Sequence, residues 1–206
     1  MDTLILAIDR AARTLSMSAV ARRPNPSATT PVQSPLSAAD AARSIGLMRV
    51  NHAGEVAAQA LYQGQAFGSR SPELRAKLSD AADEELDHLA WTRDRIHELG
   101  GRTSLLDPVW YAGAFVIGTV AGAMGDRTSL GFLQATEEQV EAHLESHLGR
   151  LPVADQPSRA IVEQMKADEA KHADMAHTLG ARELPAPLQA LMRISAKLMT
   201  AVAQKI

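Results

Sequence analysis

Two short motifs of the same type, Glu85-Leu-Asp-His88 and Glu169-Ala-Lys-His172, carry the residues that could do chemistry. In an α-helix, side chains three positions apart share a face, so the Glu and His of each motif can reach one point. Each motif also follows a glutamate at a similar distance, 30 residues for Glu55 and 32 for Glu137. The chain therefore contains two copies of one unit, a helix with a Glu followed by a helix with Glu-x-x-His.

Two such motifs with matching upstream glutamates are hard to attribute to chance. Random placement of the 12 Glu and 7 His in 206 residues would produce about 0.4 Glu-x-x-His motifs. A four-helix bundle that turns all four faces inward would gather four carboxylates and two imidazoles, the donor set of a carboxylate-bridged di-metal site. The alternative is a set of charged helix faces exposed to solvent.

The composition describes one helical domain, or one domain with a short appendage. Hydrophobic residues make up 46% of the chain and aromatic residues only 3%. Abundant Ala, Leu, Met, Gln and Glu favour helix, which predicts an all-α fold. The net charge of −3 and the lack of a basic stripe argue against a nucleic-acid partner. The absence of cysteine excludes disulfides, Cys-ligated zinc, iron–sulfur centres and thiolate nucleophiles, and agrees with a reducing compartment.

The first 37 residues differ from the rest of the chain. Asp2 and Asp9 stand where a secretory signal would have a basic region. An apolar stripe predicts a short amphipathic helix that packs on the bundle or on a membrane: Leu4, Ala7, Ile8, Ala11 and Leu15. Residues 18–37 contain four prolines, which predicts an extended or disordered linker. We therefore expect an N-terminal segment and linker, 1–37, and a bundle domain, 38–206.

Capping residues and helix breakers set the expected helices of that domain. These are 38–67 with Ser37 as cap, 72–99 between Ser71 and Gly100, a helix capped by Thr128 or Ser129, 158–179 before Gly180, and 188–206.

Residues 108–125 contain no charged side chain and are rich in glycine. At 18 residues the stretch is at the short limit for a membrane span. We predict a helix that covers the bundle and dips into a bilayer surface, with Trp110 and Tyr111 at the headgroup level. A wholly buried core helix is the alternative. The last helix has an apolar face opposite basic residues, which suits either a membrane surface or the bundle core.

Several residues near the motifs have no fixed role from the pattern. Glu137, Glu138 and Glu141 are adjacent or one turn apart, so helical spacing alone does not select the ligand. His143 lies nearly two turns after Glu137 and fits either a structural neighbour of the site or a ligand.

Two acidic residues each precede a motif by one position, Glu84 and Asp168. A metal-bound histidine usually donates its second ring N–H to a carboxylate, so both are candidates for that role. The alternative is that both side chains are exposed to solvent and do not contact the histidines. The donors themselves, carboxylates and imidazoles without thiolates, suit iron or manganese.

The surroundings of such a site decide its chemistry. Two ferrous ions can each supply an electron to O₂. A hydrophilic channel would then suit iron oxidation or peroxide handling, whereas an apolar pocket would suit oxygen insertion into an apolar substrate. The uncharged stretch 108–125 and the amphipathic C-terminus favour the apolar case.

Four longer motifs resemble the demethoxyubiquinone hydroxylase family: Arg49-Val-Asn-His-Ala-Gly-Glu-Val, Asp83-Glu-Glu-Leu-Asp-His88, Ala135-Thr-Glu-Glu138 and Asp168-Glu-Ala-Lys-His172. The resemblance runs from about Gly46 to the C-terminus. It implies a ferritin-like four-helix bundle with additional apolar or amphipathic helices. It also selects Glu137 over Glu138 and implies six metal ligands, Glu55, Glu85, His88, Glu137, Glu169 and His172.

The resemblance implies an activity as well. Family members use two non-haem iron ions, O₂ and a reductant to hydroxylate a polyprenyl methoxy-methyl-benzoquinol, demethoxyubiquinol, in ubiquinone biosynthesis. The implied location is peripheral, on the cytoplasmic face of the cell membrane. A homo-oligomer, or a complex with other ubiquinone-biosynthesis proteins, stays open. The alternative function is that of a ferritin-like protein that oxidises iron or handles peroxide without a lipid substrate.

The resemblance is incomplete at two places. His143 matches a family histidine near the site, but Leu144 stands where animal members have a tyrosine, so no role of that tyrosine carries over. Residues 1–37 match nothing in the resemblance.

Overall fold

The computed structural model describes residues 2–15, 20–31 and 35–206. These residues form helices and connecting loops, without a strand. In chain order the elements are α1 (Asp2–Leu15), the short 3-10 helix η1 (Pro26–Thr29), α2 (Ala38–Gly68), α3 (Pro72–Glu98), α4 (Asp107–Ala123), α5 (Asp126–Arg150), α6 (Gln156–Thr178) and α7 (Ala186–Ala203).

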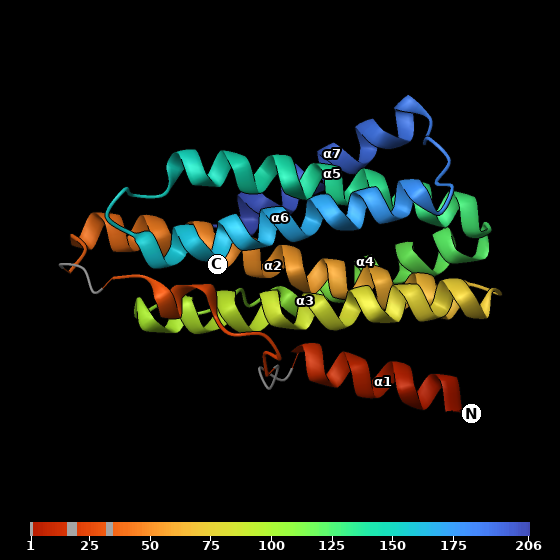
Figure 1. Cartoon of the computed structure of the whole chain (residues 1–206), viewed down its shortest axis with the longest axis horizontal. Helices are drawn as coiled ribbons and strands as arrows, with labels where there is room; N and C mark the ends of the chain where they lie inside the picture. Colours follow the sequence, from red (N-terminus) through yellow and green to blue (C-terminus); the bar gives the residue numbers. More distant parts are fainter. Residues whose placement is uncertain (1, 16–19, 32–34) are drawn as a thin grey trace.

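The longest helices, α2, α3, α5 and α6, run side by side along the length of the molecule (Figure 1). A short turn joins α2 to α3 and another joins α5 to α6, which makes two antiparallel pairs. The expected all-α four-helix bundle is therefore confirmed. Ser37 and Ser71 cap α2 and α3 as expected, and Gly100, at a φ of 79°, follows the end of α3. Apart from the start of α5, the helix boundaries agree with the expected ones to within one turn.

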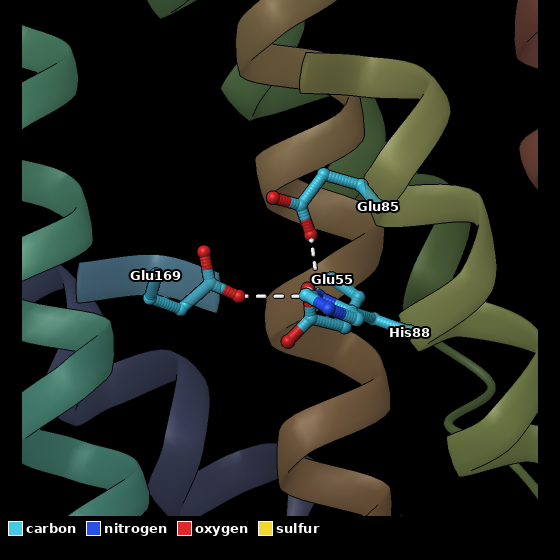
Figure 2. Close-up of side chains that lie close together, drawn as sticks. All are labelled: Glu55, Glu85, His88 and Glu169. Carbon is cyan, nitrogen blue, oxygen red and sulfur yellow. Dashed lines mark hydrogen bonds and ion pairs between the residues drawn. The ribbon is translucent and has the colours of Figure 1, made fainter. Parts of the chain in front are cut away.

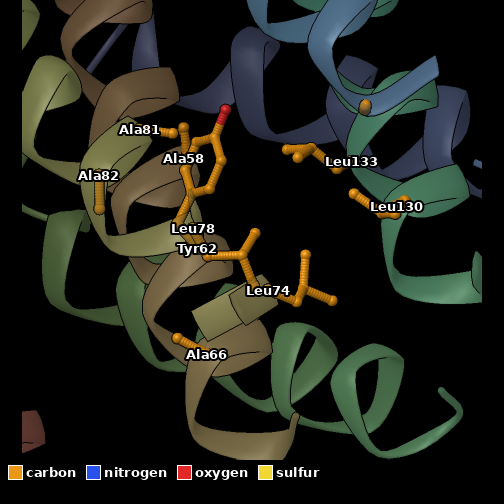
Figure 3. Close-up of a cluster of buried hydrophobic side chains, with 10 residues drawn as sticks. Ala58, Tyr62, Ala66, Leu74, Leu78, Ala81, Ala82, Leu130 and Leu133 are labelled. Atoms are coloured by element: carbon orange, nitrogen blue, oxygen red, sulfur yellow. The ribbon is translucent and has the colours of Figure 1, made fainter. Parts of the chain in front are cut away.

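Apolar clusters fill the bundle on both sides of the predicted ligands. Figure 3 shows the cluster on one side, which contains Tyr62, Leu74, Leu78, Leu130 and Leu133. The cluster on the other side contains Leu47, Met48, Trp91, Ile96, Leu144, Leu151, Ile161, Val162 and Met165. Burying each large side chain contributes about 1.5–3 kcal/mol to the stability of the fold. The predicted ligands therefore lie in a layer between two stable apolar cores that exclude water.

Helix α4 packs along α2 through glycines instead of large side chains. A Cβ placed at Gly64 or Gly68 of α2, or at Gly118 or Gly122 of α4, would overlap a backbone carbonyl oxygen of the other helix. Both pairs are Gly-x-x-x-Gly motifs, in which two glycines one turn apart leave one side of the helix without side chains. The two helix backbones therefore touch, and the larger side chains of α4 are left to face outward or toward the next helix.

Two expectations about this region were wrong. Tyr111 is buried, and its hydroxyl donates a hydrogen bond to Gln63 Oε1 on α2, so it does not lie at an outer headgroup level. Helix α5 begins at Asp126, ahead of the expected caps. Gly125 takes a φ of 100°, a left-handed conformation that suits glycine and lets α5 follow α4 almost at once.

Helix α1 lies along the outside of the bundle (Figure 1). Ala11 and Leu15 pack against an apolar cluster that includes Val56 and Leu89, so this face covers the bundle. Ile5 and Ile8 are exposed. The side chain of Leu4, expected on the same apolar stripe, lies outside the described residues.

Within the extended or disordered linker expected over residues 18–37, residues 20–31 lie against the bundle and include η1. Asn25 caps η1 by accepting a hydrogen bond from the backbone N–H of Ser27, and η1 packs against α6. The side chain of Arg23 forms ion pairs with the bundle. Residues 18–19 and 32–34 of that linker lie outside the described residues.

Candidate metal centre

All six predicted ligands meet in the middle of the bundle. Helix α2 contributes Glu55, α3 Glu85 and His88, α5 Glu137, and α6 Glu169 and His172, each between 0% and 5% exposed. Figure 2 shows three of the glutamates turned toward the ring of His88. One donor atom from each of four of these residues lies within 4.8 Å of the others, a spacing that can hold a metal ion: Glu55, Glu85, His88 and Glu169.

The two histidines present the same nitrogen to the carboxylates. His88 Nδ1 lies 3.0 Å from Glu85 Oε2, 3.1 Å from Glu169 Oε1 and 3.6 Å from Glu55 Oε2. His172 Nδ1 lies 3.1 Å from Glu169 Oε2 and 3.2 Å from Glu85 Oε1. Each imidazole therefore faces the glutamates of both motifs, which fits two neighbouring metal positions bridged by carboxylates.

The opposite nitrogen of each ring meets an acidic residue of the other motif. His88 Nε2 lies 3.2 Å from Asp168 Oδ2, and His172 Nε2 lies 3.3 Å from Glu84 Oε2. Glu84 and Asp168 therefore each contact a predicted ligand histidine, that of the other motif, as an acceptor for a metal-bound histidine would. Such a contact fixes the ring tautomer, so Nε2 keeps the proton and Nδ1 is left free for a metal ion.

Glu137 joins the site through α5. Its Oε1 accepts a hydrogen bond of 2.8 Å from the hydroxyl of Tyr62, which is fully buried. The neighbouring Glu138 is exposed, so the structure favours Glu137 as the resemblance did.

Burial and the close carboxylates change the proton affinities of the site. Burial, together with the charge of Glu85, raises the pKa of Glu55 well above its ordinary value. Burial and a neighbouring carboxylate likewise raise the pKa of Glu137. Burial also opposes ionisation of Glu85, but His88 and His172 hold its pKa low. Although burial disfavours charged imidazoles, the glutamates raise the pKa of His172 to about 12 and that of His88 well above 6.5.

The donors fit a pair of divalent cations. Among the described residues, Glu137 Oε2 is buried without a hydrogen-bond partner. Glu85 Oε1 and Glu169 Oε1 are also buried, and each faces an imidazole nitrogen, His172 Nδ1 and His88 Nδ1 respectively. An unpaired buried oxygen of this kind is costly, and a bound cation would remove the cost. Four carboxylates balance the charge of two divalent ions, and oxygen with imidazole donors suits iron or manganese.

His143 does not belong to this cluster. Its ring lies 4.0 Å from that of His147, and in the described part of the chain its buried Nε2 has no hydrogen-bond partner. His147 Nδ1 in turn lies 2.7 Å from Asn51 Oδ1 on α2. The structure thus gives His143 a place beside a buried polar contact between α2 and α5.

Sequence reasoning missed two residues that touch the site, Tyr62 and Arg23. Tyr62 follows Glu55 by two helical turns, so the helical period could have placed it on the same face. Arg23 lies in the proline-rich stretch, far from the motifs, and no spacing in the sequence indicates its contact.

The fold and the site together define a helical bundle protein with a buried carboxylate–histidine metal centre. The chain belongs to the family described as "Ubiquinone biosynthesis protein COQ7", whose model matches residues 42–203, and its fold is the ferritin-like all-α fold of that family.

Relatives named 3-demethoxyubiquinol 3-hydroxylase match along the whole chain. The protein of Variovorax paradoxus is 57% identical over 100% of this chain and 98% of its own length. That of Chromobacterium violaceum is 54% identical over 100% of both chains, and that of Polaromonas naphthalenivorans is 57% identical over 100% of this chain and 98% of its own. Residues 1–37 are therefore included in the similarity, although the motif resemblance did not reach them.

Proposed function

We propose that this protein is a di-iron monooxygenase that hydroxylates demethoxyubiquinol, a polyprenyl methoxy-methyl-benzoquinol, in ubiquinone biosynthesis. The observation that carries the proposal is the buried cluster of four glutamates and two histidines between two apolar cores. The names of the full-length relatives support a hydroxylase of this pathway over a ferritin-like protein that stores iron or handles peroxide.

The residues of the chain have separable tasks in this reaction. Two iron ions would supply the activation of O₂, with one oxygen atom entering the ring C–H bond and the other leaving as water at the expense of a reductant. The glutamates would hold and bridge the ions, and the histidines would complete their coordination through Nδ1. The ligands predicted for this task are Glu55, Glu85, His88, Glu137, Glu169 and His172.

Other groups prepare the site for that chemistry. Asp168 and Glu84 keep the proton on Nε2 of the two histidines, so both rings offer Nδ1 in the correct tautomer. Tyr62 holds Glu137 by donating a hydrogen bond from its hydroxyl to Oε1, which leaves Oε2 without a hydrogen-bond partner among the described residues. The apolar clusters exclude water, which strengthens each charge interaction in the centre.

Anaerobic iron loading followed by turnover with a short-chain quinol tests the proposal. We expect two Fe(II) per chain, an antiferromagnetically coupled diferric product after exposure to O₂, and hydroxylated quinol. Glu169→Ala should lose one ion and all hydroxylation. Glu163→Ala is the matched control, because Glu163 is exposed on the same helix. Hydroxylation retained in Glu169→Ala, or a wild type that binds no pair of ions, would contradict the proposal.

We further propose that the protein binds peripherally to the cytoplasmic face of the cell membrane through α4 and α7. Among the described residues, no helix has both the length and the apolarity needed to cross a bilayer. Both helices nevertheless expose large apolar side chains, between 48% and 64% exposed: Val109, Val116, Ile117 and Val120 on α4, Met124 directly after it, and Leu191, Ile194 and Leu198 on α7.

These two helices meet on one side of α2. Trp110 near the start of α4 and Ala203 at the end of α7 pack in one cluster with Val50 and Ala53. The two basic residues of α7, Arg193 and Lys197, are exposed beside its apolar side chains. An apolar surface with basic neighbours fits a bilayer that contains anionic lipid, which would also hold the isoprenoid tail of the substrate.

Vesicle flotation tests the membrane proposal. Wild-type protein should float with vesicles that contain anionic phospholipid, and the double variant Ile194→Glu/Leu198→Glu should stay in solution. Val153→Glu is the control, since Val153 is a strongly exposed apolar residue in the turn between α5 and α6. Equal flotation of the double variant and the wild type would show that α7 does not bind the membrane.

A further inference from the structure

Residues 20–31 place one arginine against the metal centre from outside the bundle. Arg23 Nε donates to Asp87 Oδ2 at 2.6 Å, and Nη1 donates to Asp168 Oδ2 at 2.8 Å. The side chains of both aspartates are at most 3% exposed, whereas that of Arg23 is 35% exposed. The guanidinium carbon also lies 4.9 Å from the ring centre of Trp91. The fork of one surface arginine thus bridges α3 and α6 directly above a buried pair of carboxylates.

The backbone around Arg23 fixes this position. The N–H of Arg22 donates to Asp87 Oδ1 at 2.6 Å, so the segment holds Asp87 through both carboxylate oxygens. Ala21 packs against apolar clusters of the bundle, and Asn25 caps η1, which lies on α6. Contacts on both sides of the arginine therefore hold it without help from its own side chain.

Through Asp168, Arg23 reaches a predicted ligand. Asp168 Oδ2 contacts both Arg23 Nη1 and His88 Nε2, the latter at 3.2 Å. A metal ion bound at Nδ1 of His88, which faces the glutamates, would leave the proton on Nε2, where it donates to Asp168. Arg23 Nη2 also lies 3.4 Å from His88 Nε2. Gln164 and Lys171 occupy the other oxygen of Asp168. Arg23 thus helps to lock the carboxylate that sets the orientation of the His88 ring.

Glu84, which takes the equivalent position at His172, is not held by a cation in the same way. His172 Nε2 contacts Glu84, whose side chain is 52% exposed. Within residues 2–15, 20–31 and 35–206, Glu84 forms no ion pair with Lys or Arg. A half-exposed carboxylate without a cation can turn away at little cost, whereas Asp168 is held by four side chains.

We propose that Arg23 is a positioning residue of the metal centre, which orients His88 through Asp168 and makes the half that contains His88 bind its ion more tightly than the half that contains His172. The inference rests on the proposed function, because it takes the six buried residues as ligands of two ions. It also gives the N-terminal segment a task in the centre.

Anaerobic titration of the metal-free full-length protein with Co(II), followed by ligand-field absorption, tests this proposal. We expect two binding phases in the wild type. Arg23→Ala should weaken the tighter phase by about 10–100-fold, shift its absorption bands, and leave the weaker phase unchanged. Arg23→Lys should restore part of the loss, because one ammonium supplies the charge without the fork that bridges both aspartates. Arg22→Ala is the control, since its exposed side chain pairs with Asp83, its sole ion-pair partner among the described residues.

Three results would overturn the inference. Arg23→Ala could titrate as the wild type does, which would make the contact irrelevant to metal binding. Both phases could weaken equally, which would make Arg23 a general structural residue; the thermal midpoint of the metal-free variant would then fall as well. A wild type that binds no pair of ions would overturn the proposed function, and the inference with it.

Discussion

The metal-free protein should lose stability as the pH rises from about 7 to about 9. An unfolded chain loses its imidazole protons near a pKa of about 6.5. In the folded chain the glutamates raise the pKa of His172 to about 12 and that of His88 well above 6.5, against the effect of burial. The folded state therefore binds more protons than the unfolded state throughout this range.

The sign and size of the effect follow from proton linkage. A raised histidine pKa contributes stability that is fully present below about pH 6.5 and is lost as the pH rises toward the folded pKa. Each proton held only by the folded state changes the free energy of unfolding by about 1.4 kcal/mol per pH unit. His172, with a folded pKa of about 12, alone gives a loss of about 1.4 kcal/mol per unit, and His88 adds to this loss with the same sign. Glu55 and Glu137, whose pKa values are also raised by burial, act with the same sign.

Urea unfolding of chelator-treated protein at several pH values measures this slope. His172→Ala should reduce it by about one proton, 1.4 kcal/mol per pH unit. His177→Ala should leave it unchanged, because His177 is exposed at the end of the same helix. Bound Fe(II) should remove most of the slope, since the metal replaces the protons and binds only the folded state. A flat or rising stability of the metal-free protein between about pH 7 and about pH 9 would refute the reasoning.

Three further substitutions probe the surroundings of the centre. Tyr62→Phe removes the donor to buried Glu137 and should lower the unfolding free energy by about 1.5–3 kcal/mol in urea; an unchanged value would mean that water replaces the hydroxyl. Gly118→Ala should cost about 1–3 kcal/mol by forcing α4 away from α2, whereas Gly113→Ala, which meets open space, should gain up to about 1 kcal/mol; similar effects of both would contradict the close backbone contact. Burial raises the pKa of Asp107 to about 7, so the cost of this carboxyl grows between its unfolded pKa of about 3.9 and that value. Asp107→Asn should therefore raise the thermal midpoint more at about pH 8 than at about pH 5; an equal effect at both would contradict the buried charge.

The sequence predicted the features that depend on helix geometry. The i, i+3 spacing in Glu85–His88 and Glu169–His172 places both donors of a motif on one face whatever the rest of the fold does. Ser37, Ser71 and Gly100 set helix ends through local hydrogen bonds and backbone angles. These signals extend over at most a few residues, so a single sequence is enough to read them.

Features that depend on contacts between helices were not predictable in the same way. The uncharged stretch 108–125 gave no indication of which side of α4 faces inward, because apolar residues occupy every side. The close approach at Gly118 and Gly122 decides it, and this turns Tyr111 inward. Arg23 is a stronger case, since its partners Asp87 and Asp168 lie on two helices that only the folded bundle brings together.

The two sequence repeats produce a centre with equal donors in unequal surroundings. Seven residues after its glutamate, the first unit has Tyr62, whose hydroxyl holds Glu137, whereas the second unit has Leu144, which lies in an apolar cluster. Arg23 pairs with the carboxylate that contacts His88, whereas the carboxylate that contacts His172 has no arginine partner among the described residues. A bundle of two identical units would give both metal positions the same affinity. These two departures from the repeat, at Tyr62 and Arg23, are therefore where the chain can distinguish one metal position from the other.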